Sequence, residues 1–76
     1  MNIKIYTLPT CPWCAKTKDF FKLHKLKYEE FDVSNNKNAA KEMIKKSGQN
    51  GVPVTVINGK IIIGFDKENL KKALKL

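Results

Sequence analysis

The hydrophobic and polar positions of the chain follow two periods, which divide it into short predicted elements. Residues 3–7 are β-prone, and from Pro12 the apolar positions recur every three or four residues, as in an amphipathic helix. One face of this predicted helix carries Thr17, Phe20, Phe21 and His24, and Leu23 and Leu26 widen this stripe. We therefore expect a strand followed by a helix in the first third of the chain.

The middle of the chain predicts another strand and another helix. Residues 28–33 are β-prone, and the polar turn at residues 34–36 offers a helix N-cap. Residues 38–47 have the helical period, and Gly48 stands where a helix commonly ends in the left-handed conformation. The inward positions of this second helix are Ala40, Met43 and Ile44.

A hairpin and a last helix complete the pattern. Residues 54–57 and 60–63 flank Asn58-Gly59, which is the strongest two-residue signal for a type I′ turn. Asp66 stands where it can cap the following helix. The inward positions of this last helix are Leu70, Ala73 and Leu74.

The order of these elements, βαβαββα, predicts an α/β protein with a thioredoxin-like fold. A strand, a crossover helix and a second strand form a parallel pair, whereas the hairpin is antiparallel. We therefore expect a four-stranded mixed sheet with three helices distributed over both faces. The length of 76 residues fits one domain, and we expect residues 1–76 to form it.

The number and distribution of charged residues argue against one class of function, nucleic-acid binding. Fifteen lysines, no arginine and seven acidic residues give a formal net charge of +8. The lysines are scattered at the spacing of solvated helix faces, and no arginine is present for bidentate contacts to bases and phosphates. We therefore expect no nucleic-acid partner. The positive field should instead favour thiolates and acidic partners.

The chain has no feature of a membrane-bound or exported protein. Its longest apolar stretch, Ile61-Ile62-Ile63, is far shorter than the roughly 20 residues that a membrane span needs. The N-terminus runs directly into the first predicted strand, without the apolar region of a signal peptide. We expect a cytoplasmic monomer that does not bind membranes.

The motif Cys11-Pro12-Trp13-Cys14 lies between the first predicted strand and the first predicted helix. A C-x-x-C pair beside a βαβ unit is typical of a redox-active site. Cys11 falls at the helix N-cap, and Pro12 falls at the first helical position, where its missing N–H costs nothing. Free N–H groups and the helix dipole should lower the pKa of the Cys11 thiol, whereas Cys14 should remain a thiol deeper in the helix.

Other uses of the two cysteines are less favourable. A structural disulfide across two residues closes so small a loop that it gains little chain entropy. Zinc needs about four ligands, and beyond the cysteines the chain offers His24, which lies about three turns along the first helix. We therefore expect His24 to be an ordinary helix residue and expect no metal site within one chain. A cluster shared between two chains stays open.

In combination, the motifs resemble those of the glutaredoxin family over essentially the whole chain. The marks are residues 5–7 leading into the Cys11–Cys14 motif, Val52-Pro53 before the third strand, and residues 64–66 before the last helix. The resemblance implies reduction of protein disulfides and glutathione mixed disulfides, with Cys11 as the nucleophile and Cys14 as the resolving thiol. It implies glutathione as a co-substrate, no bound cofactor, and disulfide-containing or glutathionylated proteins as partners.

The resemblance also implies a groove for glutathione. Trp13 occupies the aromatic position that lines it, and Pro53 is the proline that is cis in the family, so that the residue before it pairs its backbone with the tripeptide. The loop before the last helix would meet the γ-glutamyl carboxylate at the helix N-terminus. The implied groove residues are Trp13, Val52, Pro53, Gly64, Phe65 and Asp66.

Several positions depart from the pattern of glutathione-dependent members. Leu8 stands where many carry a basic residue, and Gly51 stands in place of the usual threonine. Gly64-Phe65 resembles the redoxins that donate electrons to ribonucleotide reductase and are reduced by thioredoxin reductase. Two alternatives therefore stay open: such a donor, with a thioredoxin reductase as partner, or an iron–sulfur carrier bridged through Cys11 and glutathione.

Overall fold

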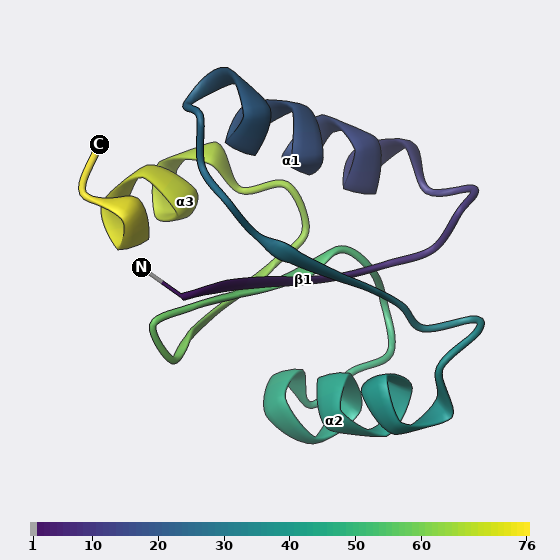
Figure 1. Ribbon diagram of the computed structural model, residues 1–76. Coiled ribbons are helices and arrows are strands. Elements are labelled where there is room, and N and C mark those ends of the chain that lie inside the picture. Colours follow the sequence, from purple (N-terminus) through teal and green to yellow (C-terminus); the bar gives the residue numbers. More distant parts are fainter. Residues whose placement is uncertain (1) are drawn as a thin grey trace.

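The computed structural model describes residues 2–76 (Figure 1). Its strands are β1 (Ile3–Thr7), β2 (Glu29–Asp32), β3 (Val54–Ile57) and β4 (Lys60–Ile63). Its helices are α1 (Pro12–Leu23), α2 (Lys37–Ser47) and α3 (Lys67–Leu74). The order is the predicted one, although β2 is shorter than expected and α2 begins one residue earlier. Among the described residues, no helix has the length and apolar character needed to cross a bilayer.

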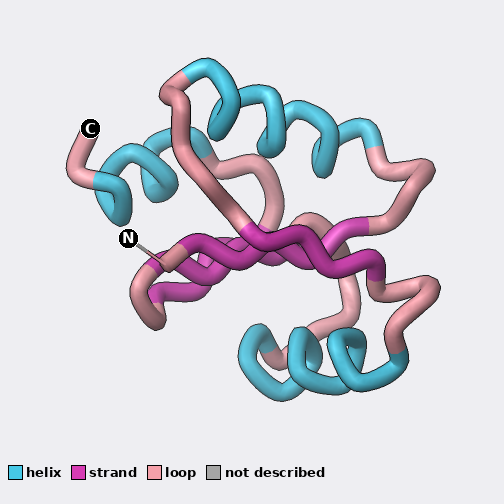
Figure 2. The backbone as a smooth tube through the Cα atoms, viewed as in Figure 1, coloured by secondary structure: helices cyan, strands magenta, loops and turns pink. Residues whose placement is uncertain are grey.

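The strands form one mixed sheet in the order β2-β1-β3-β4. β1 and β2 are parallel, with Tyr6 opposite Phe31, whereas β3 is antiparallel to both β1 and β4. α1 and α3 lie on one face of the sheet and α2 lies on the other (Figures 1 and 2). The predicted thioredoxin-like arrangement is confirmed.

Side-chain alternation along the strands divides the interior into two cores. The α1/α3 core consists of Ile3, Ile5, Phe20, Phe21, Ile57, Ile62, Leu70 and Leu74. The α2 core consists of Tyr6, Ala39, Met43, Val54 and Val56. Because successive strand residues point to opposite faces, the neighbours Ile5 and Tyr6 belong to different cores.

The predicted turn and caps are confirmed. Asn58 and Gly59 have φ angles of 50° and 87°, and a type I′ turn requires positive φ at both central residues. Asn36 and Asp66 cap α2 and α3, because their side chains accept hydrogen bonds from backbone N–H groups three residues later. Gly48 ends α2 with a φ of 72°.

Several positions assigned to helix interiors lie at the surface. Leu23 is 77% exposed and Ile44 is 46% exposed. On α2, Ala39 is the buried alanine and Ala40 is only half-buried. These predictions are wrong because a helix on an open sheet face encloses only the residues along its line of contact, so the buried arc is narrower than the apolar stripe.

Candidate active site

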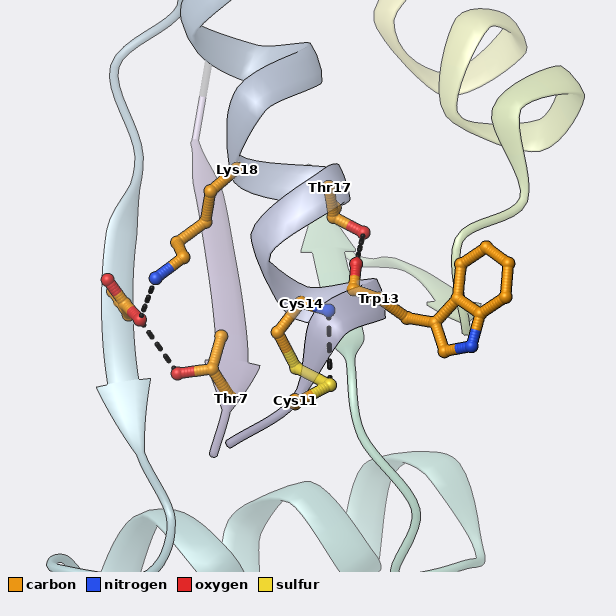
Figure 3. A network of polar contacts seen from close by, with 7 residues as sticks. Thr7, Cys11, Trp13, Cys14, Thr17 and Lys18 are labelled. Carbon is orange, nitrogen blue, oxygen red and sulfur yellow. Dashed lines mark hydrogen bonds and ion pairs between the residues drawn. A yellow bond between two sulfur atoms is a disulfide. The ribbon is translucent and has the colours of Figure 1, made fainter. Parts of the chain in front are cut away.

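The C-x-x-C motif caps the first helix. Cys11 is the N-cap of α1, with extended backbone angles (φ −95°, ψ 108°), and Pro12 begins the first turn, as predicted. The Cys11 sulfur accepts a hydrogen bond from the Cys14 N–H, with an N···S distance of 3.1 Å. The two cysteines form a disulfide, and their Cα atoms are 5.2 Å apart (Figure 3).

The two sulfur-bearing residues differ in accessibility. Cys14 is 1% exposed, whereas Cys11 is half-buried. The N-terminal N–H groups and the positive end of the α1 dipole are directed toward Cys11. A negative charge on the Cys11 sulfur is therefore favoured, and a reagent arriving from solvent meets Cys11 before Cys14.

The Val52–Pro53 segment, about forty positions further along the chain, lies against the C-x-x-C motif. The Val52–Pro53 peptide bond is cis, which confirms what the family resemblance implied. The Cys11 Sγ lies 3.9 Å from the Val52 carbonyl oxygen. The Pro53 carbonyl accepts a hydrogen bond of 2.8 Å from the Gly64 N–H. The proline segment therefore links the cysteine motif to the loop before α3.

The loop before α3 is held by its own contacts. Gly64 has a φ of 76°, a backbone angle that residues with a side chain rarely adopt. The Asp66 carboxylate accepts hydrogen bonds from the Asn69 backbone N–H at 3.2 Å and from the Asn69 side-chain amide at 2.6 Å. Asp66 is thus engaged as the helix cap, so an anion at this end of α3 would be bound by backbone N–H groups.

Trp13 projects from α1 toward the loop before α3, away from the disulfide (Figure 3). The residue is 54% exposed, and its ring stacks on Phe65 with centroids 6.4 Å apart and an interplanar angle of 27°. Phe65 in turn meets Phe20 edge-on at 6.3 Å. The Lys16 ammonium lies 4.6 Å from the centroid of the Trp13 ring, within the range of a cation–π contact. These contacts connect the cysteine motif to the α1/α3 core.

A polar network beside the motif was not predicted from the sequence. The Thr7 hydroxyl donates to the Glu30 carboxylate at 2.8 Å, and the Lys18 ammonium contacts the same oxygen at 2.9 Å (Figure 3). The hydrogen bond from Lys18 is the largest cause that holds the pKa of Glu30 below its usual value. The three residues come from β1, β2 and α1. Predicting their contact would have required the register of the parallel pair β1 and β2, which places Thr7 and Glu30 near each other.

The structure separates His24 from the two cysteines. His24 follows the last turn of α1, at the opposite end from Cys11, and its ring packs on Phe20 with centroids 4.6 Å apart. Within residues 2–76, no three His, Cys, Asp or Glu side chains are close enough together to hold a metal ion.

A cysteine pair at the N-terminus of the first helix, beside a cis-proline segment on a mixed sheet, defines a thiol–disulfide redox protein with a thioredoxin-like fold. The family model described as glutaredoxin matches residues 3–62. The chain therefore belongs to the glutaredoxin family. The matched range includes the cysteine motif and the Val52–Pro53 segment, and it ends before Gly64.

Two relatives show how far the similarity extends. An uncharacterised glutaredoxin-like 8.6 kDa protein in the rubredoxin operon of Clostridium pasteurianum is 42% identical over 73 residues, covering 96% of this chain and 97% of the relative. Glutaredoxin 3 of Escherichia coli strain K12 is 35% identical over 65 residues, covering 86% of this chain and 78% of the relative.

Two solved structures resemble the chain closely. The thioredoxin-like protein BC3987 superposes with a TM-score of 0.89 at 35% identity, covering 95% of this chain and 99% of that chain. NrdH-redoxin from Escherichia coli, a glutaredoxin-like protein with a thioredoxin-like activity profile, superposes with a TM-score of 0.85 at 25% identity. That match covers 95% of this chain and 93% of NrdH-redoxin.

Proposed function

We propose that this protein reduces protein disulfides and glutathione mixed disulfides by thiol–disulfide exchange at Cys11 and Cys14. The observation that carries the proposal is the asymmetry of the pair: Cys11 is half-buried at the N-terminus of α1, and Cys14 is 1% exposed behind it. Such chemistry suits a reducing compartment, so we also propose a cytoplasmic location.

The first step uses the reduced pair. The Cys11 thiolate attacks one sulfur of the substrate disulfide, so that a bond forms between Cys11 and the substrate while the substrate S–S bond breaks. The displaced substrate sulfur leaves as a thiolate and takes a proton from solvent. The Cys14 N–H, 3.1 Å from the Cys11 sulfur, stabilises the attacking thiolate together with the helix dipole.

The second step can follow either of two routes. Cys14 can lose its proton and attack the Cys11 sulfur, which releases the second substrate thiol and forms the disulfide seen in the structure. The substrate then has gained two electrons and two protons. In the other route, Cys11 carries a glutathionyl group, and the thiolate of a second glutathione attacks the glutathionyl sulfur. The bond to Cys11 breaks, glutathione disulfide leaves, and the Cys11 thiolate is restored without any reaction of Cys14.

The loops around Cys11 support glutathione as the co-substrate. The Val52 carbonyl oxygen lies 3.9 Å from the Cys11 sulfur, so a tripeptide joined to Cys11 could pair with the backbone of this segment. Its γ-glutamyl carboxylate could then reach the N-terminus of α3, beyond Asp66. The formal net charge of +8 attracts such an anion. In this arrangement Trp13, Pro53, Gly64 and Phe65 complete the groove.

A second candidate function is electron donation to ribonucleotide reductase, with recharging by a thioredoxin reductase. Two observations favour it. Leu8 provides no cation for a glutathione carboxylate, and the chain resembles NrdH-redoxin over 95% of its length. In this function the Cys11–Cys14 disulfide is again the oxidised product, but its reductant is a protein.

The reductant separates the two candidates. The oxidised protein is offered glutathione with glutathione reductase and NADPH, or thioredoxin reductase with NADPH, and NADPH consumption is followed. Faster reduction by glutathione supports the first candidate, and faster reduction by the reductase supports the second. A brown, dimeric protein after anaerobic purification would instead indicate an iron–sulfur carrier.

Variants of the cysteines test the proposed steps. Cys11→Ser should abolish reduction of every disulfide, because the attacking sulfur is lost. Cys14→Ser should keep the reduction of glutathione mixed disulfides and lose the dithiol reduction of protein disulfides. Ala15→Ser, at an exposed neighbouring position, is the matched control and should keep both. Loss of both activities in Cys14→Ser would contradict the glutathione route.

A further inference from the structure

A groove between α1 and α3 begins beside Trp13, shares Phe65 with the proposed glutathione site, and extends away from that site to Leu23. Its lining residues are Lys16, Asp19, Phe20, Leu23, Phe65 and Lys67. Its volume is about 390 Å³, which is within the usual range of ligand pockets. Phe65 both lines the groove and stacks on Trp13, so the groove is continuous with the candidate active site.

The groove presents apolar surface that the fold leaves uncovered. Leu23 is 77% exposed, and Trp13 at the other end is 54% exposed. Single exposed apolar residues are common, but these two lie along one strip of surface with Phe65 between them. Trp13 and Leu23 are ten positions apart along the helix, which corresponds to a rise of about 15 Å. A strip of this length could hold about four or five residues of extended chain.

Lysines flank this apolar strip. Lys16 lines the groove from α1, and Lys67 lines it from the first turn of α3. Asp19 is the one acidic side chain among the described lining residues. With a formal net charge of +8 on the whole chain, the groove favours an acidic occupant. A second copy of this chain would carry the same charge and be repelled.

We propose that the groove binds a segment of the protein whose disulfide is being reduced, and that this segment carries a bulky apolar side chain flanked by carboxylates. The inference rests on the proposed reduction of protein disulfides and names the class of protein that is reduced. The apolar side chain contacts Leu23 and Phe65, and the carboxylates face Lys16 and Lys67. A small disulfide reacts at Cys11 without reaching Leu23, so the groove discriminates among protein substrates only.

The test uses peptides of defined sequence. One peptide has a single cysteine in a mixed disulfide with mercaptoethanol and, about four residues away on either side, a leucine flanked by two glutamates. The second peptide has serine in place of leucine and lysine in place of glutamate. Bis(2-hydroxyethyl) disulfide serves as the small substrate. The wild-type protein should reduce the acidic peptide with a kcat/KM about tenfold or more above that of the basic one.

Variants at Leu23 separate the groove from the redox centre. Leu23→Glu removes the apolar contact and adds a like charge, so it should lower kcat/KM for the acidic peptide by about tenfold. Leu23→Lys removes the apolar contact but adds an attractive charge, so its loss should be smaller. Neither variant should change reduction of the small disulfide by more than about twofold. Ile44→Glu and Ile44→Lys, at an exposed apolar position on α2, are the matched controls and should keep the wild-type preference.

The outcomes distinguish the two proposals. If Leu23→Glu keeps the full preference for the acidic peptide, or if the wild-type protein shows no preference, the groove proposal is overturned while the redox function stands. If the wild-type protein reduces neither peptide nor the small disulfide, the proposed function itself fails. Circular dichroism melting of each variant establishes that the proteins compared are folded.

Discussion

Two neighbouring residues of β1, Tyr6 and Thr7, show how differently the two faces of the sheet are used. Both hydroxyl groups donate to a carboxylate at 2.8 Å, Tyr6 to Glu42 and Thr7 to Glu30. A lysine also contacts each carboxylate. Because strand residues alternate between faces, Thr7 lies on the α1/α3 side with the cysteines and Tyr6 lies on the α2 side.

A polar network alone therefore does not define an active site in this fold. The α1/α3 side has, besides its network, the N-terminus of α1 at Cys11, the cis-proline segment 3.9 Å from the Cys11 sulfur, and exposed aromatic surface at Trp13. The α2 side has Tyr6 stacked on Phe31 and packed with Met43. We therefore expect substitutions on the α2 side to affect stability, and those around Cys11 to affect reactivity.

The largest expected contrast is between Met43→Ala and Cys11→Ser. Met43 is 2% exposed in the α2 core, so its truncation should lower the free energy of unfolding by about 2–5 kcal/mol. Disulfide reduction per folded molecule should stay unchanged, whereas Cys11→Ser loses that reduction without unfolding. Chemical denaturation and the disulfide reduction assay measure the two quantities. A Met43→Ala protein that is folded but inactive would show that the faces are coupled.

At high pH, ionisation of the buried Tyr6 hydroxyl on the α2 side should lower the stability of the protein. Burial, followed by the hydrogen bond to Glu42, raises the pKa of Tyr6 from 10.0 to about 12. Since the neutral form is favoured in the folded protein, its contribution to stability is complete below pH 10 and is lost as the pH rises toward about 12. Tyr6→Phe should remove this part of the pH dependence.

The contribution of Tyr6 is measured as the difference in unfolding free energy between the wild type and Tyr6→Phe. Unfolding free energies of wild type and Tyr6→Phe are compared across this pH range, so that lysine titration, common to both, cancels. The absorbance of tyrosinate, recorded in parallel, should show a transition at about pH 12 in the wild type that the variant lacks. If this transition occurs at pH 10 instead, the hydroxyl is not buried against Glu42.

The smallest expected effects come from the two helix caps. Asn36→Ala on α2 and Asp66→Ala on α3 should each cost about 1 kcal/mol of stability. Only Asp66→Ala should also raise the KM for a glutathione mixed disulfide, because it loosens the loop that meets the proposed carboxylate. Asp66→Ser keeps a capping oxygen and should recover most of both losses. Equal KM values in Asn36→Ala and Asp66→Ala would contradict the proposed place of the γ-glutamyl group.

Local features of the chain were predicted well. The N-caps at Cys11, Asn36 and Asp66 and the turn at Asn58-Gly59 depend on residues within one turn of helix or hairpin, so neighbouring residues suffice to predict them. The cis bond before Pro53 followed from the family resemblance. Burial was predicted less well, because Leu23 and Ile44 have the apolar period of their helices but lie beside the line of contact with the sheet.

The order of the elements and the place of the two cysteines at the start of a helix follow from periodicity and capping within short segments, so the amino-acid sequence is enough to predict them. The surroundings of the two cysteines depend on tertiary contacts. Pairing of β1 with β3 brings Val52 to Cys11, the parallel register of β1 and β2 brings Glu30 to Thr7, and packing of α3 beside α1 brings Phe65 to Trp13. These contacts join residues more than twenty positions apart, and such distances are closed only when the whole sheet is assembled.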